Sequence, residues 1–127
     1  MANIAEQIVD MLVKAGVKRI YAVTGDSLNK INDAVRKDGR IQWIHVRHEE
    51  TGAFAAGAEA QLHGNLACCA GSSGPGHVHL INGLYDAHRS GAPVLAIAST
   101  IISGEFGTTY FLSLIHISEP TRPISIS

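Results

Sequence analysis

Four short apolar runs, separated by segments with helical spacing, constrain the fold of this 127-residue chain more than any other feature. The last run, Val94-Leu95-Ala96-Ile97-Ala98, has no polar position, which is typical of parallel strands buried on both faces. Strands that alternate with helices are joined by right-handed crossovers, so the strands lie parallel in one sheet. We therefore predict an α/β fold, with an open, mostly parallel sheet and helices on both faces.

The boundaries of the elements follow from hydrophobic periodicity and from capping residues. Asn3 with Glu6 resembles a capping box at the start of the first helix, and Asp26 or Ser27 is expected to cap the second helix. The predicted helices are 3–15, 26 or 27 to 37, 49–62 and 77–88, and the predicted strands are 20–23, 41–46, 66–70 and 94–98. The inward face of the last helix is expected to comprise Val78, Ile81, Leu84 and Tyr85.

Composition argues against several classes of protein. The net charge is −1 and charged residues make up 17%, so there is no basic surplus for nucleic-acid binding. The apolar stretches are too short for a transmembrane helix, and the first residues lack the pattern of a signal peptide. Cys68 and Cys69 are neighbours in a predicted strand, where their side chains point to opposite faces and do not readily form a disulfide. We expect a globular, cytoplasmic protein with reduced cysteines.

Glu49 follows the strand 41–46, at the carboxyl edge where open α/β sheets bind their ligands. One interpretation is purely structural, because an acid in the first turn of a helix interacts favourably with the helix dipole. The alternative rests on the small residues of the same helix, which permit close approach by a planar ligand: Gly52, Ala53, Ala56, Gly57 and Ala60. A carboxyl group in such a close-packed site can hydrogen-bond a ring nitrogen of that ligand.

A glycine-rich turn, residues 71–76, follows the strand 66–70 and should open at the same edge of the sheet. Glycine and proline are common in ordinary turns, but this turn can also form a backbone platform beneath a flat ligand. No Gly-Lys-Ser/Thr follows it, so it is not a phosphate-binding P-loop. The first strand ends in residues 24–28, which lack the dinucleotide-binding fingerprint.

Two other kinds of site find little support in the sequence. Ser72 and Ser73 lie near His77, but no Gly-x-Ser-x-Gly nucleophile motif is present. His48-Glu49-Glu50 is not the His-Glu-x-x-His motif of zinc enzymes, and His77 and His79 are two positions apart on a predicted helix, so they do not share a face. We therefore expect neither a serine nucleophile nor a metal site.

Three segments, in this order, resemble thiamine-diphosphate-dependent enzymes. They are Gly16 to Asn29, Arg47 to Ala60 with its Arg-His-Glu-Glu start, and Gly74 to Asp86 with its Gly-Pro-Gly start. All belong to the pyrimidine-binding domain of that superfamily, and the resemblance covers about residues 3–111. Residues 24–27 and 79–84 make the chain most similar to the group of pyruvate oxidase and quinone-dependent pyruvate dehydrogenase. Acetolactate synthase shares the Arg-His-Glu and Gly-Pro-Gly signatures.

The resemblance implies roles for individual residues. The glutamate that matches Glu49 hydrogen-bonds the aminopyrimidine N1′ of the cofactor, which enables N4′ to remove the thiazolium C2 proton before attack on pyruvate. The residues that would border the cofactor cleft are Thr24, Gly25, Gly74, Pro75 and Gly76. His79 and Phe111 would approach the substrate.

The same resemblance implies partners outside this chain. In the family a central domain is associated with FAD, and a further domain holds Mg²⁺ and the diphosphate through a Gly-Asp-Gly motif that this sequence lacks. The active site lies between the pyrimidine domain of one subunit and the diphosphate-binding domain of another, which implies a dimer or tetramer. The expected full-length activity is the oxidative decarboxylation of pyruvate, or a related 2-oxo acid, to acetate and CO₂, and the fragment alone should be inactive. In some relatives the far C-terminus contacts the membrane.

The family pattern stops after Phe111. Residues 112–127 resemble a translated adapter sequence that recurs at the ends of unrelated proteins. We predict a partial pyrimidine-binding domain over residues 1–111 and a sequencing artefact or frameshift over residues 112–127. Two alternatives to the oxidase stay open. One is an acetolactate synthase-like carboligase, and the other is a non-catalytic α/β binding domain in which residues 112–127 close the edge of the sheet.

Overall fold

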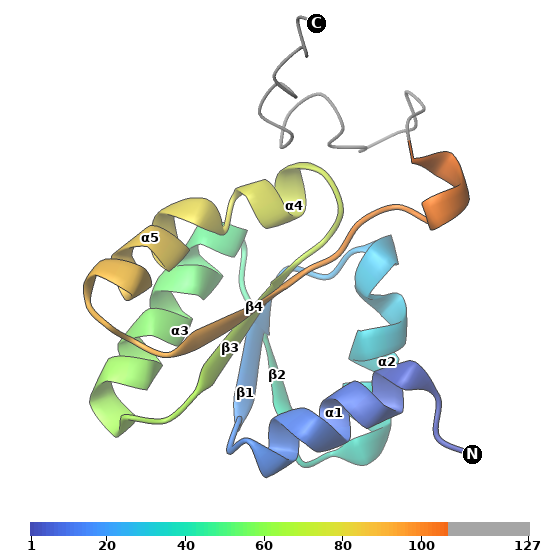
Figure 1. Ribbon diagram of the computed structural model, residues 1–127, viewed down its shortest axis with the longest axis horizontal. Coiled ribbons are helices and arrows are strands. Elements are labelled where there is room, and N and C mark those ends of the chain that lie inside the picture. Colours follow the sequence, from blue (N-terminus) through green and yellow to red (C-terminus); the bar gives the residue numbers. More distant parts are fainter. Residues whose placement is uncertain (107–127) are drawn as a thin grey trace, which may run out of the picture.

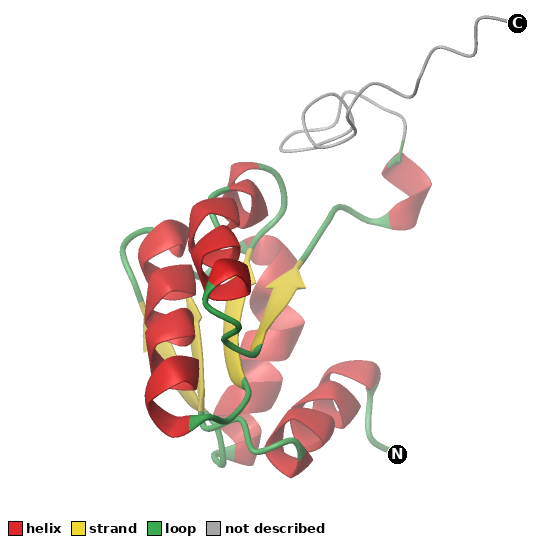
Figure 2. Cartoon of the chain, turned by 60° about the vertical axis from the view of Figure 1, so that its left-hand side comes forward, coloured by secondary structure: helices red, strands yellow, loops and turns green. Residues whose placement is uncertain are grey.

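A computed structural model describes residues 1–106, which form one parallel sheet between two layers of helices (Figures 1 and 2). The strands are β1 (Arg19–Ala22), β2 (Gln42–His45), β3 (Ala67–Gly71) and β4 (Val94–Ala98), in the order β2-β1-β3-β4. The helices are α1 (Ile4–Lys14), α2 (Asn29–Asp38), α3 (Glu49–His63), α4 (Pro75–Val78) and α5 (Ile81–Arg89), with 3₁₀ turns η1 (Asp26–Leu28) and η2 (Ser103–Glu105). All strand pairs are parallel, so the predicted fold class is confirmed. The predicted tail, residues 112–127, lies outside the described residues.

The core is divided by the sheet into two clusters. Helices α1 and α2 cover one face, and α3 and α5 cover the other, as Figure 1 shows. Cys68 belongs to the first cluster and Cys69 to the second, as their alternation along β3 predicts. Burial raises the pKa of both thiols to about 12, so neither is a reactive thiolate near neutral pH. No helix within residues 1–106 has both the length and the apolar character needed to cross a bilayer.

The predicted start of the first helix is confirmed, whereas that of the second is wrong. Asn3 Oδ1 accepts a hydrogen bond from the Glu6 amide, and the Glu6 carboxylate accepts one from the Asn3 amide, which completes the capping box. Neither Asp26 nor Ser27 caps α2, which is preceded by the 3₁₀ turn η1. The Ser27 hydroxyl bonds residues far along the chain instead, so a tertiary contact has replaced the expected local one.

The last predicted helix is interrupted at residues 79–80 and continues as α5. This interruption changes the face that α5 buries: Ile81 and Tyr85, expected to point inward, are 57% and 66% exposed. Leu80, Gly83 and Ala87 are buried in their place. The physical reason is the close approach of α3, because a Cβ on Gly83 would lie 2.4 Å from the Ala53 Cβ. Small residues at this crossing allow tighter packing than the larger apolar side chains would.

The burial of strand β4 is a second feature that differs from the prediction. Its sequence is apolar throughout and predicts burial on both faces, yet Leu95 is 40% exposed. In the described part of the chain, β4 is an edge strand that pairs only with β3. Helices cover β4 less completely than β3, so the apolar side chains of β4 are only partly buried.

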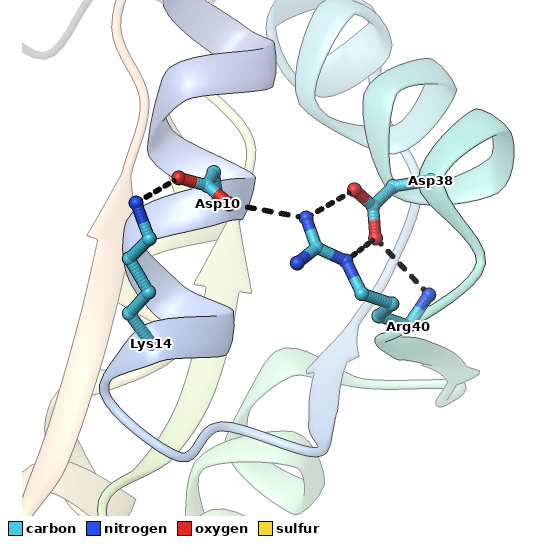
Figure 3. Close-up of polar contacts among 4 residues, drawn as sticks. All are labelled: Asp10, Lys14, Asp38 and Arg40. Carbon is cyan, nitrogen blue, oxygen red and sulfur yellow. Dashed lines mark hydrogen bonds and ion pairs between the residues drawn. The ribbon is translucent and has the colours of Figure 1, made fainter.

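Exposed ion pairs connect α1 to the end of α2 (Figure 3). Arg40 lies 3.2 Å from the Asp10 carboxylate and 2.7 Å from that of Asp38, and Lys14 lies 2.6 Å from Asp10. Hydrogen bonds from Lys14 and then Arg40 hold the pKa of Asp10 below its ordinary value. Arg40 does the same for the pKa of Asp38. Both carboxylates are thus stabilised in the ionised form.

We expect Arg40→Gln to weaken the dependence of stability on acid pH. A depressed carboxyl pKa contributes stability that is present above the unfolded-state pKa, about 3.9, and lost as pH falls through the folded-state pKa. Thermal melts at pH 7 and pH 3 should therefore differ less in the variant than in the wild type. Arg89→Gln, at the exposed end of α5 on the opposite face of the sheet, is the control and should leave the pH dependence unchanged. An unchanged pH dependence in Arg40→Gln, at low salt, would contradict this expectation.

Candidate functional site

A cleft of about 550 Å³ lies at the carboxyl edge of the sheet, where segments after β1, β2 and β3 meet. Parallel strands place the residues that follow them at a common edge, as the sequence predicts for Glu49 and the glycine-rich turn. The lining residues are Val23, Thr24, Gly25, Asp26, Arg47, His48, Glu49, Ser72, Ser73, Pro75, Gly76 and His79. The described site is thus built from three crossover connections rather than from one motif.

Glu49 is the first residue of α3, and its carboxylate is held in place by His79. The side chain of Glu49 is 12% exposed, and its Oε2 lies 3.1 Å from His79 Nδ1. An ionised carboxylate can only accept, so in that state the imidazole N–H donates. The two residues are 30 positions apart and come from different connections. One carboxylate oxygen is therefore engaged within the protein.

His48 completes a cluster with these two side chains. Its ring stacks on that of His79 with centroids 4.5 Å apart and planes inclined by 24°. His48 is also the N-cap of α3, and its Nδ1 accepts a hydrogen bond from the Glu50 amide at 3.1 Å. The sequence places His48 beside Glu49 but contains no sign that His79 stacks on it. The cluster is a product of the tertiary fold.

Glycine keeps the space beside Glu49 free of side chains. A Cβ on Gly76 would lie 3.5 Å from Glu49 Oε1 and 3.2 Å from the Ser72 Cβ. A Cβ on Gly25 would come within 2.3 Å of the Ser72 hydroxyl, so glycine there allows the connection after β1 to pack closely on the connection after β3. A flat ligand can lie against the backbone only where side chains are absent. This cradle beside a carboxylate oxygen fits an aromatic ring that offers a nitrogen to Glu49.

Three serines join the connections beneath the cleft. Ser27 Oγ lies 2.8 Å from Ser72 Oγ and 2.7 Å from Ser99 Oγ, and it accepts a hydrogen bond from the Ser73 amide at 2.9 Å. Ser99 Oγ donates to the Gly71 carbonyl. This network was not predicted from the sequence. The only signal available was that each serine occurs just after a predicted strand.

The predicted site residues occupy different places in this arrangement. Those that line the cleft are Thr24, Gly25, Glu49, Pro75, Gly76 and His79. Gly74 is buried with φ of 74°, a conformation that favours glycine, and it forms the turn into α4. His77 Nδ1 lies 2.7 Å from the Ser99 carbonyl, so this nitrogen is engaged with the backbone and not with Ser72 or Ser73. Phe111 lies outside the described residues.

Comparisons with known proteins show which family this chain belongs to. Residues 2–119 match the family model described as thiamine pyrophosphate enzyme, N-terminal TPP binding domain. The chain is 64% identical over 113 residues to an uncharacterized 42.6 kDa protein of Pseudomonas amyloderamosa. It is 48% identical over 103 residues to pyruvate oxidase of Lactiplantibacillus plantarum and 36% identical over 101 residues to acetolactate synthase of Bacillus subtilis.

The matched regions cover most of this chain but little of each relative. They comprise 87%, 80% and 80% of this chain, and 28%, 16% and 18% of the three relatives in the same order. The family match itself extends over far more than half of the sequence. The chain therefore belongs to the thiamine pyrophosphate enzyme family, within which it is an N-terminal cofactor-binding domain.

Proposed function

We propose that this chain supplies the pyrimidine-side half of the cofactor site in a pyruvate oxidase or pyruvate:quinone oxidoreductase. The reaction is the oxidative decarboxylation of pyruvate, or a related 2-oxo acid, to acetate and CO₂. The observation that carries the proposal is the Glu49 carboxylate, which lies at a strand end beside a glycine-lined cradle. The similarity to a pyruvate oxidase, 48% against 36% for an acetolactate synthase, favours the oxidase.

The residues of this chain would bind and orient the aminopyrimidine ring and would move a proton. Glu49 Oε2 is held by His79, and Oε1 lies on the side of the Gly76 cradle, where it would hold a proton shared with a ring nitrogen. The backbone at Gly25 and Gly76, with Thr24 and Pro75 at the border, would accommodate the aminopyrimidine ring. Thiamine diphosphate, when bound, supplies the electron sink that decarboxylation of a 2-oxo acid requires.

The proposal requires partners that this chain does not provide. A diphosphate-binding domain of a second subunit would supply the Mg²⁺ and diphosphate site, and a flavin-associated domain would hold FAD as the electron acceptor. The full-length protein would then be a homo-oligomer, a dimer or tetramer. The half-site described here would have little activity alone, because the other cofactor contacts come from the partner.

Domain grafting tests this function and its alternative together. Residues 1–106 would replace the aligned segment in the L. plantarum pyruvate oxidase and, separately, in the B. subtilis acetolactate synthase. We expect the oxidase chimera to consume pyruvate at a larger fraction of its host's rate than the synthase chimera does. The reverse ranking would favour the carboligase, and two folded but inactive chimeras would favour a non-catalytic binding domain.

A further inference from the structure

We propose that His48, Glu49 and His79 form a binding site for a divalent transition-metal ion, with Zn²⁺ as the best match. One donor atom from each side chain lies within 4.8 Å of the others. Two imidazoles and one carboxylate are a donor set that suits zinc, and they come from the start of α3 and the connection between α4 and α5. All three residues line the cleft, where water can supply a fourth ligand.

Two of the three donors already have the spacing of metal ligands. Zinc bonds of about 2.0–2.2 Å in tetrahedral geometry place neighbouring donors about 3.3 Å apart. Glu49 Oε2 and His79 Nδ1 are 3.1 Å apart, so an ion can replace the proton that they share. That proton leaves to solvent when the ion binds, since the ligating nitrogen must be unprotonated.

The third donor has room to move. His48 is an exposed residue, and its donor atom must approach the other two by no more than roughly 1.5 Å to reach ligand spacing. Its Nδ1 already carries a lone pair, because that atom accepts a hydrogen bond from the Glu50 amide. Coordination through this nitrogen would exchange the N-cap hydrogen bond for a metal bond. Each imidazole binds an ion in the plane of its own ring, so the His48 ring must also turn out of its stack on His79 to coordinate the same ion.

Zinc binding at this site would prevent activation of the cofactor, an inference that rests on the proposed function. A Glu49 carboxylate bound to a dication through Oε2 binds a proton poorly, so its Oε1 could no longer share a proton with an aminopyrimidine nitrogen. Bound Zn²⁺ and activated cofactor would therefore exclude each other, which makes the site inhibitory. The metal-binding claim itself is tested without cofactor, so its failure is distinguishable from failure of the proposed function.

The test is a zinc titration of the 127-residue chain against a chromogenic zinc indicator. We expect one site per chain, with affinity reduced about tenfold or more in His48→Gln, Glu49→Gln and His79→Gln. His88→Gln, on the exposed surface of α5, is the matched control and should leave the affinity unchanged. Equal affinities in all variants, or equal losses in the control, would overturn the proposal.

A measurement on the unmodified chain guards against variants that fail to fold. Zinc should shift or broaden the imidazole proton resonances of His48 and His79 in NMR spectra, and leave those of His88 in place. Perturbation of His88 alone, or of no histidine at one equivalent of zinc, would also overturn the proposal.

Discussion

Glu49→Gln is expected to reduce pyruvate turnover by the oxidase chimera about 10²–10⁴-fold, which corresponds to about 3–5 kcal/mol of barrier. The reason is that glutamine keeps the size and the acceptor oxygen of glutamate but cannot exchange a proton with a ring nitrogen. The fold should be unaffected, because the amide oxygen can still accept from His79. The measurement is steady-state turnover combined with hydrogen–deuterium exchange at the cofactor C2 position.

Glu50→Gln is the matched control for this experiment. Glu50 is adjacent in sequence, but its carboxylate accepts a hydrogen bond from Asn82 at 3.3 Å and does not line the cleft. We expect this variant to retain turnover within a few-fold of the unmodified chimera. Undiminished turnover and C2 exchange in Glu49→Gln would remove Glu49 from the proposed proton relay, whatever the behaviour of Glu50→Gln.

Gly83→Ala is expected to destabilise the chain by about 1–3 kcal/mol, because it overpacks the crossing of α3 and α5. The new Cβ would lie 2.4 Å from the Ala53 Cβ and 2.7 Å from the Phe54 amide nitrogen. Backbone atoms cannot be displaced as a flexible side chain can, so the helices must separate. A domain of this size loses about 4–8 °C in melting temperature for each kcal/mol, which thermal denaturation will resolve.

Gly57→Ala offers a contrasting change at the same pair of helices. A Cβ on Gly57 would lie 3.5 Å from the Ala87 Cβ, an ordinary van der Waals distance. Alanine is the better helix former by about 1 kcal/mol, so we expect this variant to be as stable as the wild type or more stable. Destabilisation of both variants to the same extent would show that close helix packing is not the cause.

Much of the fold was predictable because its signals are local. The apolar strands and helical periodicities determine the alternation of elements, and alternation leads to parallel strands with a shared carboxyl edge. The capping box of Asn3 and Glu6 is equally local, since its partners are three residues apart. Glu49 and the turn with Gly76 follow two strands of that sheet, so their meeting in one cleft also follows from the sequence.

The remaining features depend on contacts between segments that are distant along the chain. Ser27 hydrogen-bonds Ser72 and Ser99 instead of capping a helix. The close packing of Gly83 on Ala53 determines which face of α5 is buried. Among the described strands, the order β2-β1-β3-β4 places β4 at an edge, which its own apolar sequence cannot indicate. The stacking of His48 on His79 likewise requires the connection before α5 to lie over the start of α3. The sequence by itself determined the architecture and the position of Glu49, because periodicity and capping act over a few residues. Only the tertiary structure decided what surrounds Glu49, because those contacts exist only after the crossovers have packed against the sheet.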